Sequence, residues 1–179
     1  MGRMDAVIVV VATYLLYVMA AGFAAVWWFD EDRVGKLQVV VAAIIGLVLV
    51  GVFIAVAGAV HDDPRPFMQD PSLNNLLHHA PGNGFPSDHS CAAGLIAGLV
   101  VFRHRLYGAL LAVAAVLVGV ARVAAHAHHL QDVAAGLALG FLAAWVATLL
   151  ATALISRLDL VGRLHLGSGG NVGPRVQRG

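Results

Sequence analysis

Five apolar runs divide this chain and leave few folds open to it. They lie at about 6–28, 37–60, 89–102, 106–125 and 131–155, and a helix needs about 20 such residues to cross a bilayer. Hydrophobic residues make up 60% of the 179 residues and charged residues only 12%, whereas a soluble domain has roughly half and a quarter. We therefore predict an all-α fold, a polytopic membrane helix bundle of about five transmembrane helices.

The run at 89–102 is shorter than the others and begins beside polar Ser87, Asp88 and His89. Polar groups at membrane depth are tolerated where protein surrounds them, so we expect this helix to start inside the protein, with its first turn in a pocket. The run at 6–28 exceeds the roughly 7–15 apolar residues of a secretory signal, and we interpret it as a retained helix.

Small residues within the runs predict how the helices pack. Glycines four apart, Gly94 with Gly98 and Gly136 with Gly140, favour close approach between spans. The single cysteine, Cys91, excludes an intramolecular disulfide, and we expect it to be a small apolar helix residue.

Lys and Arg residues predict the orientation in the membrane, because positively charged loops stay in the cytoplasm. Eight of the 11 would share one side: Arg33, Lys36, Arg103, Arg105, Arg157, Arg163, Arg175 and Arg178. The other side holds Arg3, Arg65 and Arg122. We therefore expect the N-terminus and the polar clusters described below outside the cell, and the C-terminus in the cytoplasm.

Segment 61–86 is the one long connection and is rich in proline and glycine. We predict an irregular loop with one short helix from Ser72 to His79, capped by Ser72. Residues 1–160 are expected to form one transmembrane domain. Residues 161–179 contain much Gly and Arg and little apolar content, so we expect a disordered cytoplasmic tail there.

Two arginines stand at the ends of predicted spans, Arg65 between two prolines and Arg122 shortly before a histidine. A phosphoryl group spreads its charge over several oxygens, and planar guanidinium groups can grip two of them at once. The structural alternative is that each arginine extends to the lipid headgroups. Their neighbours in the sequence favour a phosphate site.

The segment Pro86-Ser87-Asp88-His89 is typical of a helix start, with Ser87 as the cap. Free backbone N–H groups at such a start form a seat for an anion. Capping alone would explain Ser87 and Asp88. It does not explain His89, because an ionisable group at the start of a span is costly without a function.

His128 and Asp132 are four residues apart, so on a helix both side chains would share one face. The carboxylate could then accept a proton from one imidazole nitrogen and leave the other free for attack, as in catalytic triads. A purely structural pair has the same spacing. The two arginines and the second histidine on the same side favour catalysis.

Further histidines require a metal site to be weighed: His61, His78, His79, His126 and His129, with Asp62 and Asp63 nearby. Their spacing matches no zinc signature, so we predict no metal and expect these side chains to line the polar mouth. The net charge of +1, without a basic run interleaved with aromatics, predicts no nucleic-acid partner.

Together these residues resemble the type 2 phosphatidic acid phosphatase (PAP2) superfamily, whose signatures are Lys-x6-Arg-Pro, Pro-Ser-Gly-His and Ser-Arg-x5-His-x3-Asp. Arg65-Pro66 matches the first, Pro86 to His89 the second, and Arg122, His128 and Asp132 the third. The surrounding residues, with His79-Ala80-Pro81 and Phe85 before the second signature, are similar to the undecaprenyl-diphosphate phosphatase branch of the bacitracin-resistance type.

Three positions depart from the signatures. Gly58 stands in place of the lysine, Asp88 in place of the glycine and Ala121 in place of the serine. The first two departures are usual in this branch. The resemblance implies that the two arginines suffice without the lysine, and that one hydroxyl donor to the phosphate is absent.

The resemblance also implies a mechanism without metal or cofactor. His128 would take the terminal phosphoryl group of undecaprenyl diphosphate, Asp132 would orient it, and His89 would protonate the leaving oxygen and later activate water. The charge of the transferring group would be stabilised by Arg65, Arg122, Ser87 and the Asp88 amide.

Other functions remain open at this point. The substrate could be phosphatidic acid or phosphatidylglycerophosphate, or the enzyme could be a lipid phosphotransferase. A transporter that binds a phosphorylated lipid without cleaving it is the alternative from a different class. It would require polar groups near the middle of the bilayer, whereas here they gather at one face.

Overall fold

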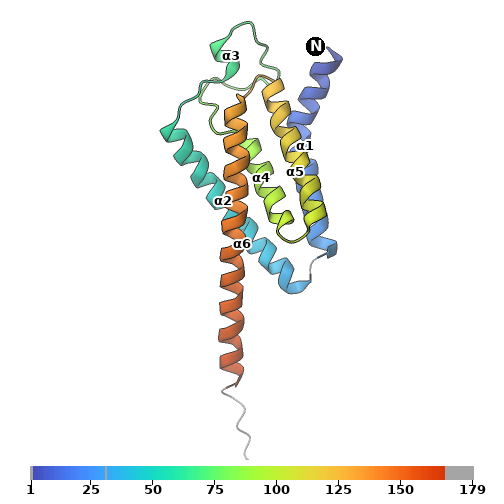
Figure 1. Ribbon diagram of the computed structural model, residues 1–179, viewed down its shortest axis with the longest axis vertical. Coiled ribbons are helices and arrows are strands. Elements are labelled where there is room, and N and C mark those ends of the chain that lie inside the picture. Colours follow the sequence, from blue (N-terminus) through green and yellow to red (C-terminus); the bar gives the residue numbers. More distant parts are fainter. Residues whose placement is uncertain (1, 31, 168–179) are drawn as a thin grey trace, which may run out of the picture.

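The computed structural model describes residues 2–30 and 32–167. Six helices follow one another: α1 (Arg3–Asp30), α2 (Arg33–Val60), α3 (Pro66–Gln69), α4 (Asp88–Val101), α5 (Arg105–Ala124) and α6 (Leu130–Gly167). The described residues contain no strand beyond one isolated bridge between Pro64 and Asn83. The prediction of an all-α bundle is confirmed (Figure 1).

Four helices, α1, α2, α5 and α6, are long and apolar enough to cross a membrane. The third predicted span, α4, has only 14 residues, about 21 Å at 1.5 Å per residue, which is short of the roughly 30 Å hydrocarbon core. It contacts all four long helices. Protein therefore surrounds α4 and buries Ser87 at its start, as predicted, whereas Asp88 in its first turn is exposed.

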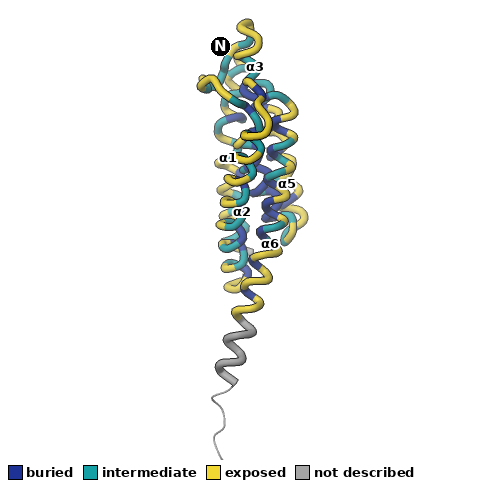
Figure 2. The backbone as a smooth tube through the Cα atoms, turned by 90° about the vertical axis from the view of Figure 1, so that its left-hand side faces the viewer, coloured by how far each residue is buried: buried dark blue, intermediate teal, exposed yellow. Residues whose placement is uncertain are grey.

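The buried residues lie inside the bundle, where α4 contributes nine of its 14 residues, and the outward faces of the helices are exposed (Figure 2). Cys91 is fully buried in α4, as expected for a small apolar residue. Large side chains such as Val10, Leu47 and Leu110 are exposed on α1, α2 and α5. Exposed apolar surface of this extent suits a hydrocarbon environment.

Glycines let α4 and α6 approach until their backbones touch. A methyl group at Gly94 would lie 2.6 Å from the carbonyl oxygen of Leu137, and one at Gly140 would collide with the carbonyl of Cys91. The predicted close packing at these glycines is confirmed. The same approach brings the starts of α4 and α6 together, where the amide of Ser87 donates to the Asp132 carbonyl at 3.1 Å.

Segment 61–86 forms a loop over one end of the bundle (Figure 1). The helix predicted at Ser72–His79 was wrong, because those residues form turns. The short helix is α3, with Pro66 at its first position, where a missing N–H costs nothing. Ser72 instead donates its hydroxyl to Asp70 at 2.7 Å, and such local side-chain bonds compete with a helix.

Asn83 holds the two ends of this loop together. Its Oδ1 accepts from the amides of Asp63 at 3.0 Å and Phe85 at 2.8 Å. Its Nδ2 donates to the carbonyls of Gly58 at 3.1 Å and His61 at 2.9 Å. One side chain thus satisfies four backbone groups, so the loop does not need a sheet or helix to do so.

At the other end, α6 continues to Gly167, past residue 161, where the tail was expected to begin. Residues 168–179 lie outside the described residues, so a disordered tail there stays a prediction.

Candidate active site

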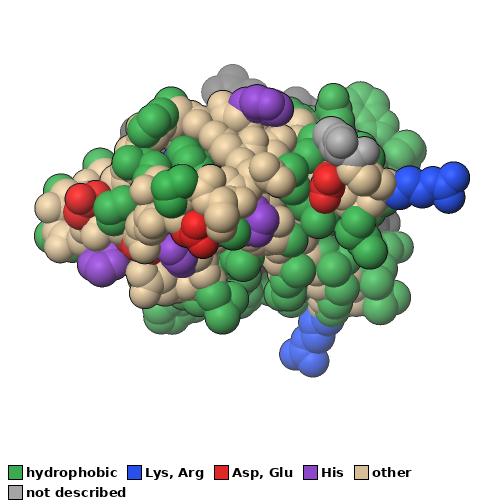
Figure 3. All heavy atoms as spheres, turned by 90° about the horizontal axis from the view of Figure 1, so that it is seen from above, with side chains coloured by type: hydrophobic (Ala, Val, Ile, Leu, Met, Phe, Trp, Pro, Cys, Tyr) green, Lys and Arg blue, Asp and Glu red, His purple; other side chains and the backbone are tan. Residues whose placement is uncertain are grey.

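The predicted site residues lie at one end of the bundle. α4 and α6 start there, α5 ends there, and the loop 61–86 crosses above them (Figure 1). Figure 3 looks onto this end, where His and Asp side chains gather and the visible Lys and Arg side chains project from the edge. Residues far apart in the sequence meet here, such as Arg65 and His128, which are 63 positions apart.

His128 is the buried centre of the site, with 3% of its surface exposed. Its Nδ1 lies 2.9 Å from the carbonyl oxygen of Gly84 and 3.5 Å from Oδ2 of Asp132. Because a carbonyl can only accept, Nδ1 carries a proton, and in the neutral ring this leaves Nε2 with a free lone pair. The carboxylate of Asp132 was predicted to fix the tautomer of His128. In the structure the carbonyl of Gly84 makes the shorter contact with Nδ1, and Asp132 makes the longer one.

Asp132 contributes a second contact that explains its longer distance to His128. Its Oδ2 accepts from the backbone amide of His129 at 2.8 Å, so the carboxylate also caps the start of α6. His128 lies in the turn before α6, whose first residue is Leu130. The predicted contact between His128 and Asp132 is thus present, but His128 reaches Asp132 from the turn before α6 and not from the same helix.

Both arginines point at Nε2 of His128. Arg65 Nη1 lies 3.3 Å from it and Arg122 Nη2 lies 3.5 Å from it. Arg122 is 3% exposed, so it does not extend to the headgroups. Each guanidinium also has a buried Nε with no hydrogen-bond partner among the described residues.

Buried cations with unused donors are costly unless an anion satisfies them. Within the described part of the chain, no carboxylate forms a salt bridge with Arg65 or Arg122. Arg65 Nη1 donates to the carbonyl of Ala127 at 2.9 Å, which fixes its direction. The arrangement is that of an anion site built against Nε2 of His128.

Ser87, Asp88 and His89 lie at the start of α4 beside this anion site. Ser87 occupies the capping position but makes no capping hydrogen bond, and its Oγ accepts from Ser90 at 3.1 Å. Ser87 is thus the cap residue, as predicted, although its side chain bonds with Ser90 and not with the backbone of α4. Asp88 is exposed. His89 is half-buried, and the charges of Arg122 and His128 act on its ring.

His79 is a site residue that the sequence did not single out. Its Nε2 lies 2.6 Å from Arg122 Nη2, and its ring centre lies 6.3 Å from that of His128. Burial, and then the charges of Arg122 and Arg65, lower the pKa of His79 to about 4. The neutral ring accepts a hydrogen bond from Arg122. The sequence signals were a histidine pair in a long loop, interpreted as lining the mouth, and the His79-Ala80-Pro81 resemblance, to which no role was attached.

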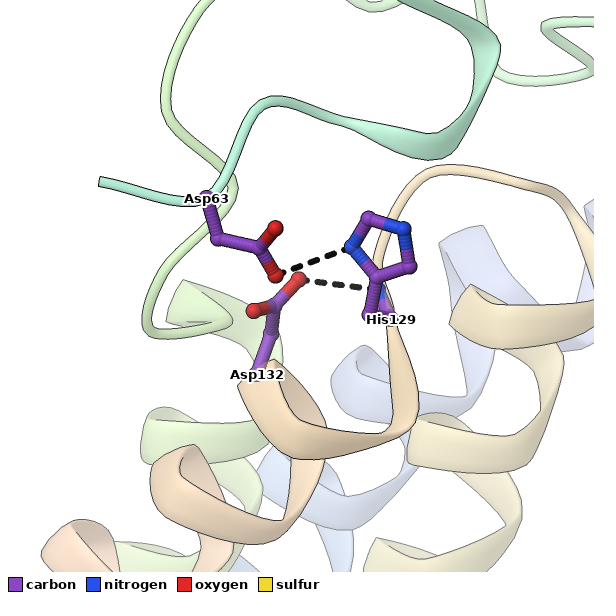
Figure 4. A group of neighbouring side chains, drawn as sticks. All are labelled: Asp63, His129 and Asp132. Carbon is purple, nitrogen blue, oxygen red and sulfur yellow. Dashed lines mark hydrogen bonds and ion pairs between the residues drawn. The ribbon is translucent and has the colours of Figure 1, made fainter. Parts of the chain in front are cut away.

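A second cluster adjoins Asp132 (Figure 4). Asp63 Oδ2 accepts from His129 Nδ1 at 2.9 Å and from Gln131 Nε2 at 2.6 Å. Burial alone would raise the pKa of Asp63, but hydrogen bonding from Gln131 and the charge of His129 hold it below its usual value. This cluster ties the loop to the start of α6.

Asp63, His129 and Asp132 are the described residues whose donor atoms could hold a metal ion, since all lie within 4.8 Å of one another. In the structure these atoms are engaged in hydrogen bonds. A cation would have to take the place of the proton on His129 Nδ1.

A family model supplies the remaining evidence. The model described as the PAP2 superfamily matches residues 35–156. The chain belongs to the PAP2 superfamily. This PAP2 protein is a multi-pass membrane protein, as its apolar helices and its structural neighbours indicate.

Relatives of this PAP2 protein carry names of the predicted branch. It is 33% identical to the bacitracin transport permease protein BcrC of Bacillus licheniformis over 79% of the chain and 68% of that protein. It is 27% identical to the undecaprenyl-diphosphatase BcrC of Bacillus subtilis over 90% of the chain and 82% of the relative. The crystal structure of Aquifex aeolicus LpxE is similar in fold, with a TM-score of 0.62 and 24% identity. The match covers 82% of this chain and 86% of the LpxE chain.

The structure also accounts for one departure from the PAP2 signatures. A side chain at Gly58 would begin 3.2 Å from the carbonyl oxygen of Phe85, and the Asn83 amide lies close behind. The loop therefore lies close to the place from which a lysine would extend, and it would have to shift by a few tenths of an ångström to admit one. No described contact explains Ala121, which is buried in α5.

Proposed function

We propose that this PAP2 lipid phosphatase hydrolyses undecaprenyl diphosphate to undecaprenyl phosphate and inorganic phosphate. The observation that carries the proposal is the convergence of Arg65 and Arg122 on Nε2 of His128. The diphosphate specificity is supported by the name of the Bacillus subtilis relative.

Each site residue has a role that follows from its position. Nε2 of His128 attacks the terminal phosphorus, and the bond to the bridging oxygen breaks. His89 gives a proton to the leaving lipid phosphate and then removes one from the water that hydrolyses the phosphohistidine. Gly84 and Asp132 stabilise the proton on Nδ1.

The transferring group gains negative charge that must be stabilised by groups already in place. Arg65 and Arg122 offer unused buried donors. The first turn of α4, at Asp88 and His89, offers backbone N–H groups that the Ser87 side chain leaves uncapped.

An apolar hollow supports a lipid substrate. It has a volume of about 520 Å³ between α4, α5 and α6, and its lining includes Ala97, Val116, Phe141 and Trp145. The ends of the same helices carry His89 and Arg122. An isoprenoid chain in the hollow would leave its diphosphate at the polar end.

The pocket is proposed to open on the extracytoplasmic side, with the C-terminus in the cytoplasm. The support is the Lys and Arg distribution: among the described residues, those at the opposite end of the bundle include Arg33, Lys36, Arg103, Arg105 and Arg157. Residues 1–160 are proposed to act as one membrane domain.

The test is phosphate release by the purified full-length protein in detergent micelles. Wild type should release phosphate faster from undecaprenyl diphosphate than from phosphatidic acid or phosphatidylglycerophosphate. His128→Ala removes the nucleophile and should lower turnover at least about a thousandfold. The exposed neighbour of the pocket, His78, gives the control His78→Asn, which keeps a residue that tolerates its positive φ of 52°.

Two outcomes would overturn parts of the proposal separately. Unchanged turnover in His128→Ala would remove the assigned nucleophile. Faster release from phosphatidic acid would remove the assigned substrate and leave the site intact. Acid-labile, base-stable radiolabel on wild type, absent in His128→Ala, would identify the phosphohistidine.

We also propose that the reaction needs no metal ion, because Arg65 and Arg122 already provide positive charge beside His128. EDTA should leave phosphate release unchanged. The opposite result would be that EDTA removes the activity, that an added divalent cation restores it, and that Asp63→Asn prevents this restoration. A metal would then be assigned to the cluster of Asp63, His129 and Asp132.

A further inference from the structure

The imidazole of His79 occupies a hydrogen-bonding position that a phosphate needs. Its Nε2 lies 2.6 Å from Nη2 of Arg122, and the same Nη2 faces His128 Nε2 at 3.5 Å. A phosphate oxygen held against His128 would use this donor. His79 Nε2 therefore lies beside any phosphate that Arg122 holds against His128.

The loop is built to hold His79 at this position. Asn75 binds its backbone on both sides, since the His79 amide donates to Asn75 Oδ1 at 3.0 Å and Asn75 Nδ2 donates to the His79 carbonyl at 2.8 Å. His126 Nδ1 donates to the carbonyl of Asn74 at 3.1 Å and ties the same stretch to the end of α5. These contacts fix the backbone and leave the ring free to turn.

We propose that His79 is a phosphate-binding residue that takes up a proton when the phosphate arrives, and so becomes the third cation of the site beside Arg65 and Arg122. The proposal rests on the proposed phosphatase site but not on the identity of the lipid. Its ligand class is the terminal phosphoryl group of the substrate, or inorganic phosphate as product.

The charges that face His79 explain why it is neutral before binding. They come from Arg122 on α5, Arg65 before α3, His128 in the turn before α6 and His89 on α4. These groups are positive or can become so, and with burial they lower the pKa of His79 to about 4. The ring therefore accepts a hydrogen bond from Arg122 and bears no charge near neutral pH.

A bound phosphate reverses this balance. It brings between one and two negative charges to within hydrogen-bond distance, and a nearby opposite charge favours the protonated imidazole. The Nε2 that accepted from Arg122 then becomes a donor to phosphate. Gly58 has no side chain, so His79 provides a charge that this position does not.

The experiment measures binding of inorganic phosphate to the purified full-length protein by titration calorimetry. Two buffers with different protonation enthalpies give the number of protons taken up. His79→Gln keeps a hydrogen-bonding amide beside Arg122 but cannot become a cation. It should bind phosphate about tenfold to a hundredfold more weakly than wild type and should take up fewer protons at pH 7. His78→Asn, the exposed neighbour, should match wild type in both measurements.

The pH profile adds a second readout. Binding coupled to proton uptake weakens as the pH rises, beyond the change due to phosphate itself. This extra slope should be present in wild type and lost in His79→Gln. Equal thermal unfolding of the two proteins shows that the fold is retained.

A His79→Gln protein that matches wild type in affinity or in proton uptake would overturn the inference, as would a wild type that binds no phosphate. Failure of the proposed function looks different. A wild type that does not hydrolyse undecaprenyl diphosphate, but binds phosphate with the stated dependence on His79, would remove the substrate and leave the inference standing.

Discussion

The α4–α6 interface and the loop 61–86 both place active-site groups, but by different means. The interface brings Ser87 and Asp132 together through glycines at which the two helix backbones touch. The loop places Gly84 and His79 through separate hydrogen bonds from Asn83 and Asn75 to the backbone. A packed backbone contact cannot give way, whereas each hydrogen bond contributes only about 1 kcal/mol. Substitutions should therefore act on the whole bundle in one region and locally in the other.

The largest effect is expected from Gly140→Ala at the interface. The added methyl would collide with the Cys91 carbonyl and lie 2.8 Å from the Leu95 amide nitrogen, and neither backbone atom can rotate away. Overpacking of this kind costs about 1–3 kcal/mol and occasionally more, and we expect the upper end. Thermal unfolding in micelles, followed by circular dichroism, measures it. Phosphate release should fall together with stability.

The matched control is Gly51→Ala on the outer face of α2, where an added methyl meets no atom within 4 Å. Alanine favours a helix over glycine by about 1 kcal/mol, so this variant should be as stable as wild type or more so. Equal unfolding temperatures for the two alanine variants would contradict the tight α4–α6 contact.

An intermediate effect, confined to the loop, is expected from Asn83→Ala. Four backbone groups would lose their partner. Water can replace part of this at the surface, so we expect a local cost of about 1–2 kcal/mol. Hydrogen exchange should quicken at the amides of Asp63 and Phe85 while the helices keep their protection. Phosphate release should fall, because Gly84 directs His128.

Asn74→Ala is the control for that variant. Asn74 lies in the same loop and is exposed, and its contact with His126 uses the backbone carbonyl, which alanine retains. Exchange at Asp63 and Phe85 should be unchanged. If helix protection fell as far in Asn83→Ala as in Gly140→Ala, the loop would not be the separable unit described above.

The interface was predictable from the sequence because its signals are local. The apolar runs predicted the spans. Two pairs of glycines four residues apart, Gly94 with Gly98 and Gly136 with Gly140, predicted the helix faces that touch. The seven proposed site residues were also found by their motifs, and the structure places all of them at one end of the bundle.

The loop was not predictable, because its contacts join distant residues through turns without periodicity. His79 meets Arg122 across 43 positions, and Gly84 meets His128 across 44. Ser72 matched a helix-cap pattern, yet its bond to Asp70 favoured a turn. Every residue has a backbone carbonyl, so the sequence does not indicate that the carbonyl of Gly84 is the one that contacts His128.

The smallest effect is expected from Asp63→Asn, which tests whether charge adds to the hydrogen bonds that join the loop to α6. The pKa of Asp63 is lower in the folded protein than its ordinary value near 3.9. Ionised Asp63 therefore stabilises the loop above that pH, and this stabilisation is lost as the pH falls through the lowered pKa. Wild type should lose exchange protection at the Gly84 amide, which donates to the Asp63 carbonyl, as the solution is acidified. Asp63→Asn keeps an acceptor for Gln131, so its protection should be slightly lower at neutral pH and should change less with acidification. The control is Asp62→Asn, at the exposed neighbour of Asp63, and it should retain the wild-type pH dependence. If Asp63→Asn showed that same dependence, the charge of Asp63 would contribute nothing to the contact between the loop and α6.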